Sequence, residues 1–183
     1  MLKIIFLLLV LGGVLWLLLW YFTQLFLLMF SKGENAVYVG SFARDLRLMR
    51  EHLHLARGKR LLDLGCGDGK ALRFFAREYG MMGSGYDINS FAIMYGKFIN
   101  LLRWYKLTLH RADFFQADLA HVDYIYLYLF PGQMLAIEDW VFSHISNDTI
   151  VIANTFQFKK HVPFEIIKDH RGKERIRLYR KWS

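Results

Sequence analysis

Apolar residues follow two different patterns along this chain. Residues 4–30 form one run without a charged side chain, reading IIFLLLVLGGVLWLLLWYFTQLFLLMF. Beyond residue 31, short apolar stretches of strand length alternate with longer stretches in which apolar residues recur every three or four positions. Strands and helices that alternate in this way are typical of a parallel sheet covered by helices on both faces.

The N-terminal run is long enough to cross a bilayer, which needs about 20 apolar residues. A cleaved signal peptide is the alternative, but its apolar core has only ~7–15 residues and is followed by small residues. Here bulky side chains continue to the end of the run. Trp16, Trp20 and Tyr21 suit an interfacial aromatic belt, so the span would end near Tyr21 and residues 23–30 would lie along the interface. We therefore expect residues 1–30 to be a retained membrane anchor.

The rest of the chain divides into residues 31–59, a linker with one helix, and residues 60–183, an α/β domain. The expected strands are 60–64, 83–86, 107–110, 124–129, 149–153, 164–168 and 175–180, and the expected helices are 41–56, 70–79, 90–105 and 133–144. The last two strands would form a hairpin around Gly172. We predict a Rossmann-like, mostly parallel seven-stranded sheet with helices on both faces and a C-terminal antiparallel hairpin, preceded by one transmembrane helix.

A glycine-rich stretch, DLGCGDGK at residues 63–70, directly follows the first expected strand. A phosphate-binding P-loop would need glycine in place of Leu64 and Ser or Thr in place of Ala71, so that motif is excluded. A dinucleotide fingerprint would need a small residue in place of Lys70, which makes that motif a weak match. What remains is a G-x-G-x-G loop with an acidic residue two positions before its first glycine.

Acidic residues also follow the next two expected strands. Asp87 comes 22 residues after Gly65, where an acid can accept hydrogen bonds from both ribose hydroxyls of a nucleoside, although it could also cap the next helix. Asp113, followed by Phe114, comes after the third strand. Taken by itself, this pair would be explained by a surface turn. Because ligands of such folds bind at the carboxyl ends of the strands, three acids at these ends together indicate a nucleoside site.

The loop resembles motif I of class I S-adenosylmethionine-dependent methyltransferases. S-adenosylmethionine carries an ammonium group and no phosphate, so a carboxylate at the loop would favour it. Cys66 fits there as a small side chain, and we do not expect it to be a nucleophile. The resemblance implies that the cofactor is bound by Asp63, Gly65, Cys66, Gly67, Asp68, Gly69, Asp87, Ile88, Asp113 and Phe114.

Nearly the whole chain is similar to a family of membrane-anchored lysine methyltransferases, whose mitochondrial members modify the ATP synthase c-subunit and the adenine nucleotide translocase. The segments that carry this similarity are Tyr38-Val39-Gly40-Ser41, Asp113-Phe114-Phe115, Asp118-Leu119 and YLYLFPGQM at 126–134. Gly40 departs from the family's proline, and Phe114-Phe115 from its Leu-Trp. An Asn/Asp-Pro-Pro-aromatic motif, typical of enzymes that methylate base or amide nitrogens, is absent after the fourth strand.

The resemblance implies a protein-lysine N-methyltransferase. Lysine has an unperturbed pKa near ~10.4, so the site must favour the neutral amine. Tyr38, Phe130 and Gln133 are candidates for that pocket, although packing or a helix-surface position would also explain them. A lipid or quinone-like methyl acceptor is an alternative, and so is a non-catalytic cofactor-binding membrane module. One cysteine and no zinc-like histidine spacing leave no metal site expected.

The net charge of +8 is unevenly distributed. Residues 44–60 and 159–183 are strongly basic, whereas residues 61–158 are slightly acidic. Basic flanks on a tethered domain fit anionic lipid, at about 1 kcal/mol per basic residue near the surface. We therefore expect membrane lipid and a membrane-protein substrate as partners and no nucleic acid. Positive charge after the span places the domain on the cytoplasmic, or matrix-equivalent, side of a single-pass membrane protein.

Overall fold

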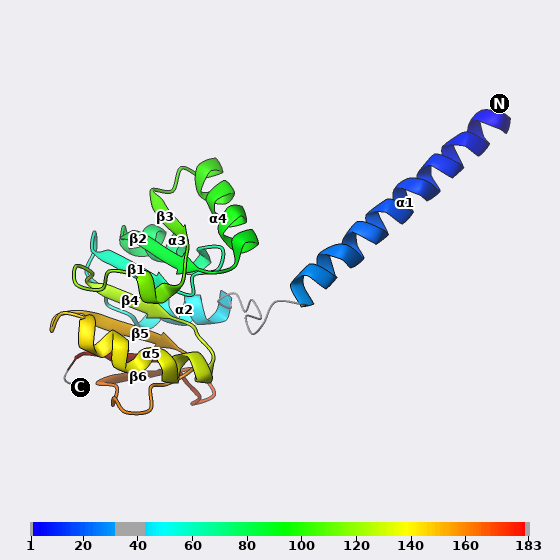
Figure 1. Ribbon diagram of the computed structural model, residues 1–183. Coiled ribbons are helices and arrows are strands. Elements are labelled where there is room, and N and C mark those ends of the chain that lie inside the picture. The colour runs from blue at the N-terminus through cyan, green and yellow to red at the C-terminus, as the bar shows by residue number, and fades with distance from the viewer. Residues whose placement is uncertain (1, 32–42, 182–183) are drawn as a thin grey trace. The chain divides into compact units, whose positions relative to one another are not determined.

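The computed structural model describes residues 2–31 and 43–181 (Figure 1). These residues form two separate units, the helix α1 (Leu2–Ser31) and an α/β domain. Tyr38, one of the three candidates for the acceptor pocket, lies outside the described residues.

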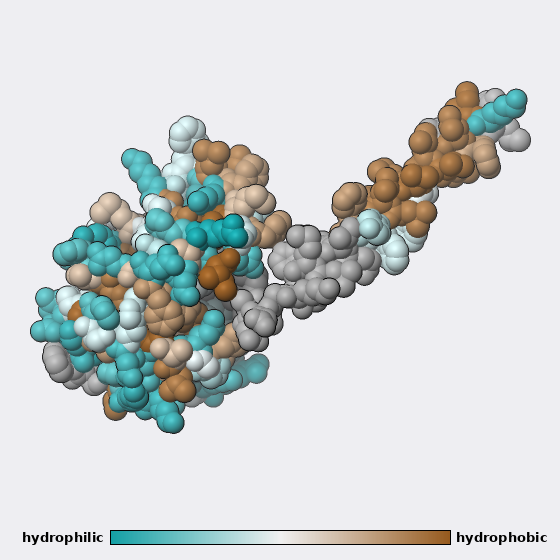
Figure 2. All heavy atoms as spheres, viewed as in Figure 1, coloured by the Kyte–Doolittle hydropathy of each residue, from teal (hydrophilic) through white to brown (hydrophobic). Residues whose placement is uncertain are grey.

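α1 is a continuous 30-residue helix whose sequence is dominated by leucine, a strong helix former. Its described side chains are exposed, and Figure 2 shows them as a mainly apolar surface. The side chains of α1 are described without a gap only over residues 9–23. Among the described residues, no helix is long and apolar enough to cross a membrane. The predicted N-terminal helix is therefore present, while the predicted membrane span is not found in the described residues.

The α/β domain contains one seven-stranded sheet with the order β3-β2-β1-β4-β5-β7-β6. The strands β1 to β5 are parallel, and β7 runs antiparallel to both β5 and β6. The predicted Rossmann-like sheet with a C-terminal hairpin is thus confirmed. The strands are β1 (Arg60–Leu64), β2 (Met82–Asp87), β3 (Leu107–Arg111), β4 (Tyr124–Leu127), β5 (Ile150–Asn154), β6 (Glu165–Lys168) and β7 (Glu174–Tyr179).

Helices cover both faces of this sheet, because alternate residues of each strand point to opposite sides. One core lies under α2 (Ala43–His52), α3 (Lys70–Tyr79) and α4 (Ser90–Leu102), and the other lies under α5 (Pro131–His144). In β1, for example, Leu61 belongs to the first core, and Leu62 and Leu64 belong to the second. A short 3₁₀ helix, η1 (Phe114–Gln116), follows β3.

Two helices end earlier than the sequence predicted. α4 stops at Leu102 because Trp104 has a φ of 55°, in the left-handed region that ends a helix. α2 stops at His52, and its apolar side chains are buried in the first core. A buried ion pair also joins α2 to the sheet: Arg175 of β7 donates to both carboxylate oxygens of Asp45, at 2.9 and 3.0 Å.

Candidate functional site

Glycines form the turn between β1 and α3. Gly65, Gly67 and Gly69 have φ values of 82°, 54° and 78°, in a region that side chains with a β-carbon rarely adopt. The backbone nitrogens of Gly65 and Cys66 donate to the carbonyl oxygen of Tyr86, at 2.9 and 3.1 Å. The loop is therefore fixed against β2 at the carboxyl end of β1, where the sequence placed it.

Two further glycines allow close packing around this loop. A β-carbon on Gly85 would lie 2.6 Å from the β-carbon of Cys66, and one on Gly96 would lie 2.2 Å from the carbonyl oxygen of Asp68. Arg73 also holds Asp68 in place, because its Nη2 lies 2.9 Å from Oδ2 of Asp68 and its Nη1 donates to the Asp68 carbonyl oxygen. Sequence reasoning missed Gly85, Gly96 and Arg73, although a glycine inside a strand or helix can mark close backbone approach.

Asp87 stands at the end of β2 and contacts the loop directly. Its Oδ2 accepts a hydrogen bond from the backbone nitrogen of Gly67 at 2.8 Å, and its Oδ1 accepts one from Asn89 at 2.7 Å. Each carboxylate oxygen can accept a second bond, so capacity for ribose hydroxyls remains. The capping of α4 belongs to Asn89, whose side chain accepts from two backbone N–H groups at 3.1 Å. Next to Asp87, Ile88 is 60% exposed and available to an apolar ligand surface.

Asp63 is a buried carboxyl behind the loop. Burial raises its pKa well above the usual range, and the nearby carboxylates of Asp87 and Asp68 raise it further. Three carboxyl groups thus meet at one edge of the sheet. A positively charged ligand at this edge would offset their repulsion, which fits the ammonium group of S-adenosylmethionine.

Cys66 is buried between the loop and β2. Burial raises the pKa of its thiol, and the carboxylates of Asp63 and Asp87 raise it further. Because the thiolate is the reactive form, this thiol is not a nucleophile at neutral pH. The described residues also contain no group of acidic, histidine or cysteine side chains that could hold a metal ion.

The end of β3 approaches the same edge, since the backbone nitrogen of Ala112 donates to the carbonyl oxygen of Asp87 at 3.2 Å. Asp113 is exposed and caps η1 by accepting a hydrogen bond from the backbone of Phe115 at 3.0 Å. Phe114 is half-buried against the core under α5. Asp113 therefore forms a surface turn, which was one of its two interpretations, and its contact with a cofactor stays a prediction.

Aromatic side chains follow β4 and β5 on the other side of the loop. The side chain of Leu129 fills the space beside Gly65, where a β-carbon would lie 2.6 Å from its Cδ2. Phe130 is 38% exposed, and its ring centroid lies 6.3 Å from that of Phe156. Gln133 caps α5, because its Oε1 accepts a hydrogen bond from the backbone of Phe130 at 3.2 Å. Of the predicted acceptor residues, Phe130 and Gln133 are thus placed together beside the loop.

A strained residue lies at the end of β5. Thr155 has a φ of 68°, which is unusual for a β-branched residue, and such strain often occurs at functional sites. Arg177 holds this conformation by donating to the carbonyl oxygen of Thr155 at 3.0 Å. The phenol of the nearby Tyr128 is protonated at neutral pH, and burial raises its pKa further. No pattern in the sequence indicated this arrangement.

Comparison with known proteins identifies the family. The sequence model described as the ANTKMT methyltransferase domain matches residues 63–165, which include the glycine loop and β4. The chain belongs to this methyltransferase family. No curated protein sequence matches this ANTKMT-family chain.

Solved structures agree with the fold of the ANTKMT-family domain. An RNA methyltransferase from Salinibacter ruber in complex with S-adenosyl-L-homocysteine has a TM-score of 0.71 and 22% identity, over 79% of this chain and 95% of that one. A SAM-dependent methyltransferase from Geobacter sulfurreducens, also in complex with S-adenosyl-L-homocysteine, has a TM-score of 0.55 and 19% identity, over 66% of this chain and 51% of that one. The chain spans about half the length of the latter. The predicted S-adenosylmethionine-dependent methyltransferase is thus confirmed by family and fold.

Proposed function

We propose that this ANTKMT-family protein is a protein-lysine N-methyltransferase that is anchored in a membrane and methylates a membrane protein. The observation that carries the proposal is the family match over residues 63–165. The sequence after β4 agrees with it, because Pro131 begins α5 there and no Asn-Pro-Pro-aromatic motif is present to hold a planar base or amide.

S-adenosylmethionine would bind across the loop at the carboxyl ends of β1 to β3 and supply a methyl group already activated on a sulfonium. The carboxyl groups of Asp63 and Asp68 would hold its ammonium group, and Asp87 its ribose hydroxyls. Ile88 offers an exposed apolar surface for the adenine ring. Gly67 matters because its backbone N–H fixes the Asp87 carboxylate at 2.8 Å before any ligand binds. Such preorganisation favours a fixed geometry for transfer.

The acceptor amine would approach from the side of Phe130 and Phe156. An apolar environment lowers the pKa of a lysine and so favours the neutral, nucleophilic form. Tyr128 is protonated at neutral pH and can therefore orient an amine without adding a negative charge that would favour ammonium. Gln133 would act as a positioning residue through its hydrogen bond to the backbone of Phe130.

A membrane location is supported by α1 and by the charge pattern. Residues 4–30 carry no charge, α1 extends over 30 residues, and its described side chains are exposed. The basic segments 44–60 and 159–183 suit the anionic cytoplasmic surface, or its matrix equivalent. Tethering would raise the effective concentration of substrates in the same membrane. Lipid and a membrane protein are therefore the proposed partners, and nucleic acid is not.

The test uses full-length protein in detergent, radiolabelled methyl donor and membranes of the host. Label in one or a few protein bands, recovered as methyl-lysine after hydrolysis, is the expected result. Label in the organic extract would replace the proposal by a lipid or quinone-like acceptor. Binding of S-adenosylhomocysteine without any transfer would indicate a non-catalytic module. The Asp87→Ala variant serves as the control for cofactor-dependent label.

A further inference from the structure

α4 exposes an apolar stripe on the side that faces away from the sheet. Its buried side carries Ala92, Ile93 and Gly96. The exposed side carries large apolar side chains at the three- and four-residue spacing of one helix face, and Leu101 is 73% exposed. These residues, called the α4 stripe here, are Phe91, Met94, Tyr95, Phe98, Leu101 and Leu102. Figure 2 shows the apolar colour over this helix.

The end of α4 adds the features of a membrane interface. Trp104 follows the stripe and is 90% exposed. Residues 90–106 contain Lys97, Arg103 and Lys106 and no acidic residue. An exposed helix face of Phe, Leu and Trp with basic neighbours is typical of helices that lie in the headgroup region of a bilayer.

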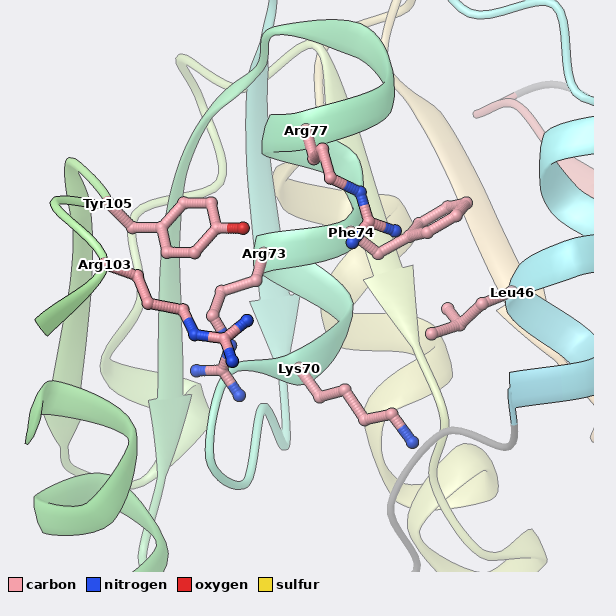
Figure 3. A pocket seen from close by; sticks show the side chains of 7 residues that line it. All are labelled: Leu46, Lys70, Arg73, Phe74, Arg77, Arg103 and Tyr105. Carbon is pink, nitrogen blue, oxygen red and sulfur yellow. The ribbon is translucent and has the colours of Figure 1, made fainter. Parts of the chain in front are cut away.

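A basic pocket of about 160 Å³ lies between α2, α3 and the turn that follows the stripe. Figure 3 shows Lys70, Arg73 and Arg77 reaching it from α3, and Arg103 reaching it from the turn after α4. Among the described residues, none that lines the pocket is acidic. Arg73 pairs with Asp68 and Arg77 pairs with Glu78, both at 2.9 Å, whereas Arg103 has no ion pair among the described residues. An anion in the pocket would reduce the repulsion between these cations.

We propose that the α4 stripe and the basic pocket form a membrane-docking surface of the methyltransferase domain. The stripe and Trp104 would enter the headgroup region, and Arg77 and Arg103 would bind the phosphate of an anionic phospholipid. This inference rests on the membrane location proposed above. It adds a second contact with the bilayer, which belongs to the domain itself and is independent of α1.

Charge complementarity selects lipid among the occupants of this surface. A second copy of the chain would bring the same three basic residues of 90–106 against each other, because a symmetric dimer pairs like surfaces. Single-stranded RNA would also satisfy the cations and stack on Phe91, Tyr95 and Phe98, but it offers no apolar partner to Met94, Leu101 and Leu102. A bilayer surface matches both the α4 stripe and the basic pocket, since its acyl chains and phosphates lie side by side.

The test is designed to be independent of methyl transfer. Full-length protein is reconstituted into vesicles of phosphatidylcholine, alone or mixed with phosphatidylglycerol, and flotation of the vesicles reports whether the chain is membrane-bound at all. An environment-sensitive dye is placed on Leu101→Cys, or on Leu135→Cys as a matched control. Leu135 is an exposed leucine of α5, on the opposite face of the sheet. Cys66 is buried with a raised pKa, so it does not compete for the dye.

The expected result is at least threefold protection of the Leu101→Cys dye from aqueous iodide, together with quenching by lipids that carry a spin label. Phosphatidylglycerol should strengthen both effects, and the Leu135→Cys dye should show neither. Arg77→Gln combined with Arg103→Gln should abolish the protection. Arg171→Gln combined with Lys173→Gln removes the same charge at the turn between β6 and β7, within the basic segment 159–183. It lowers the general attraction to anionic lipid but should leave the Leu101→Cys dye protected.

Three outcomes would overturn the inference while the chain still floats with the vesicles. Equal access of iodide to both dyes would show that α4 does not touch lipid. Protection that rises with protein concentration, without quenching by spin-labelled lipid, would show a second copy on the stripe. Protection produced by short single-stranded RNA instead of phosphatidylglycerol would identify nucleic acid as the occupant. Absence of flotation would contradict the proposed membrane location instead.

Discussion

Gly96→Ala is the sharpest test of how the cofactor loop is held. The new methyl group would lie 2.2 Å from the carbonyl oxygen of Asp68 and 2.7 Å from Cδ1 of Leu109, so loop and helix must separate until the first distance reaches at least 3.0 Å. Overpacking of this kind costs about 1–3 kcal/mol, partly offset by a gain of ~1 kcal/mol because alanine favours helix over glycine. We expect a net loss of ~0–2 kcal/mol, or a fall in Tm of up to roughly 8 °C for a protein of this size.

The same displacement should weaken cofactor binding, because Asp68 is part of the loop. A shift close to 1 Å in a preorganised site can cost on the order of 100-fold in rate, so we expect at least tenfold weaker binding of S-adenosylhomocysteine. Calorimetry and thermal unfolding of the full chain in detergent measure both effects. Gly132→Ala in the first turn of α5 is the matched control, since nothing lies within 4 Å of its added methyl group. If the two variants behave alike, close approach at Gly96 does not position the loop.

Three further variants test single contacts. Asp87→Ala should weaken S-adenosylhomocysteine binding without unfolding the domain, and unchanged affinity by calorimetry would contradict the ribose assignment. Asp63→Asn should raise the Tm of the ligand-free protein at neutral pH but weaken cofactor binding. Because the pKa of the Asp63 carboxyl is raised in the folded state, this carboxyl stabilises the fold only at low pH. That stability is lost as the pH rises toward the folded pKa. A pH series of Tm values checks the sign. Asp45→Asn leaves buried Arg175 poorly paired and should cost about 3 kcal/mol by chemical unfolding.

The sequence predicted the sheet well where local signals and burial agree. β1 and α3 have the predicted ends, because β1 is followed by Gly65 and α3 lies between Gly69 and Gly80, all with positive φ. α4 was predicted too long, since the left-handed φ of Trp104 is not visible in its periodicity. Burial could not be predicted for α4 either, because apolar residues occur on both of its faces and periodicity does not say which face meets the sheet.

The candidate site was predictable only where it is local in sequence. The glycine loop and Asp87 follow strands, so their placement follows from the topology. The ion pair between Arg73 and Asp68 and the approach of Gly96 depend on how α4 packs, and no pattern of a single element encodes that. Gln133 shows a second limit of the sequence. Its position in the chain predicts either an acceptor contact or a helix-surface residue, whereas in the structure its side chain caps α5 and holds the backbone of Phe130.

The buried pair at Asp45 connects α2 with the proposed acceptor side of the domain. α2 is the first described element of the domain, and its Asp45 and Arg44 act electrostatically on Tyr128, beside the strained Thr155. Pairing with Arg175 therefore holds the start of α2 next to the proposed acceptor pocket.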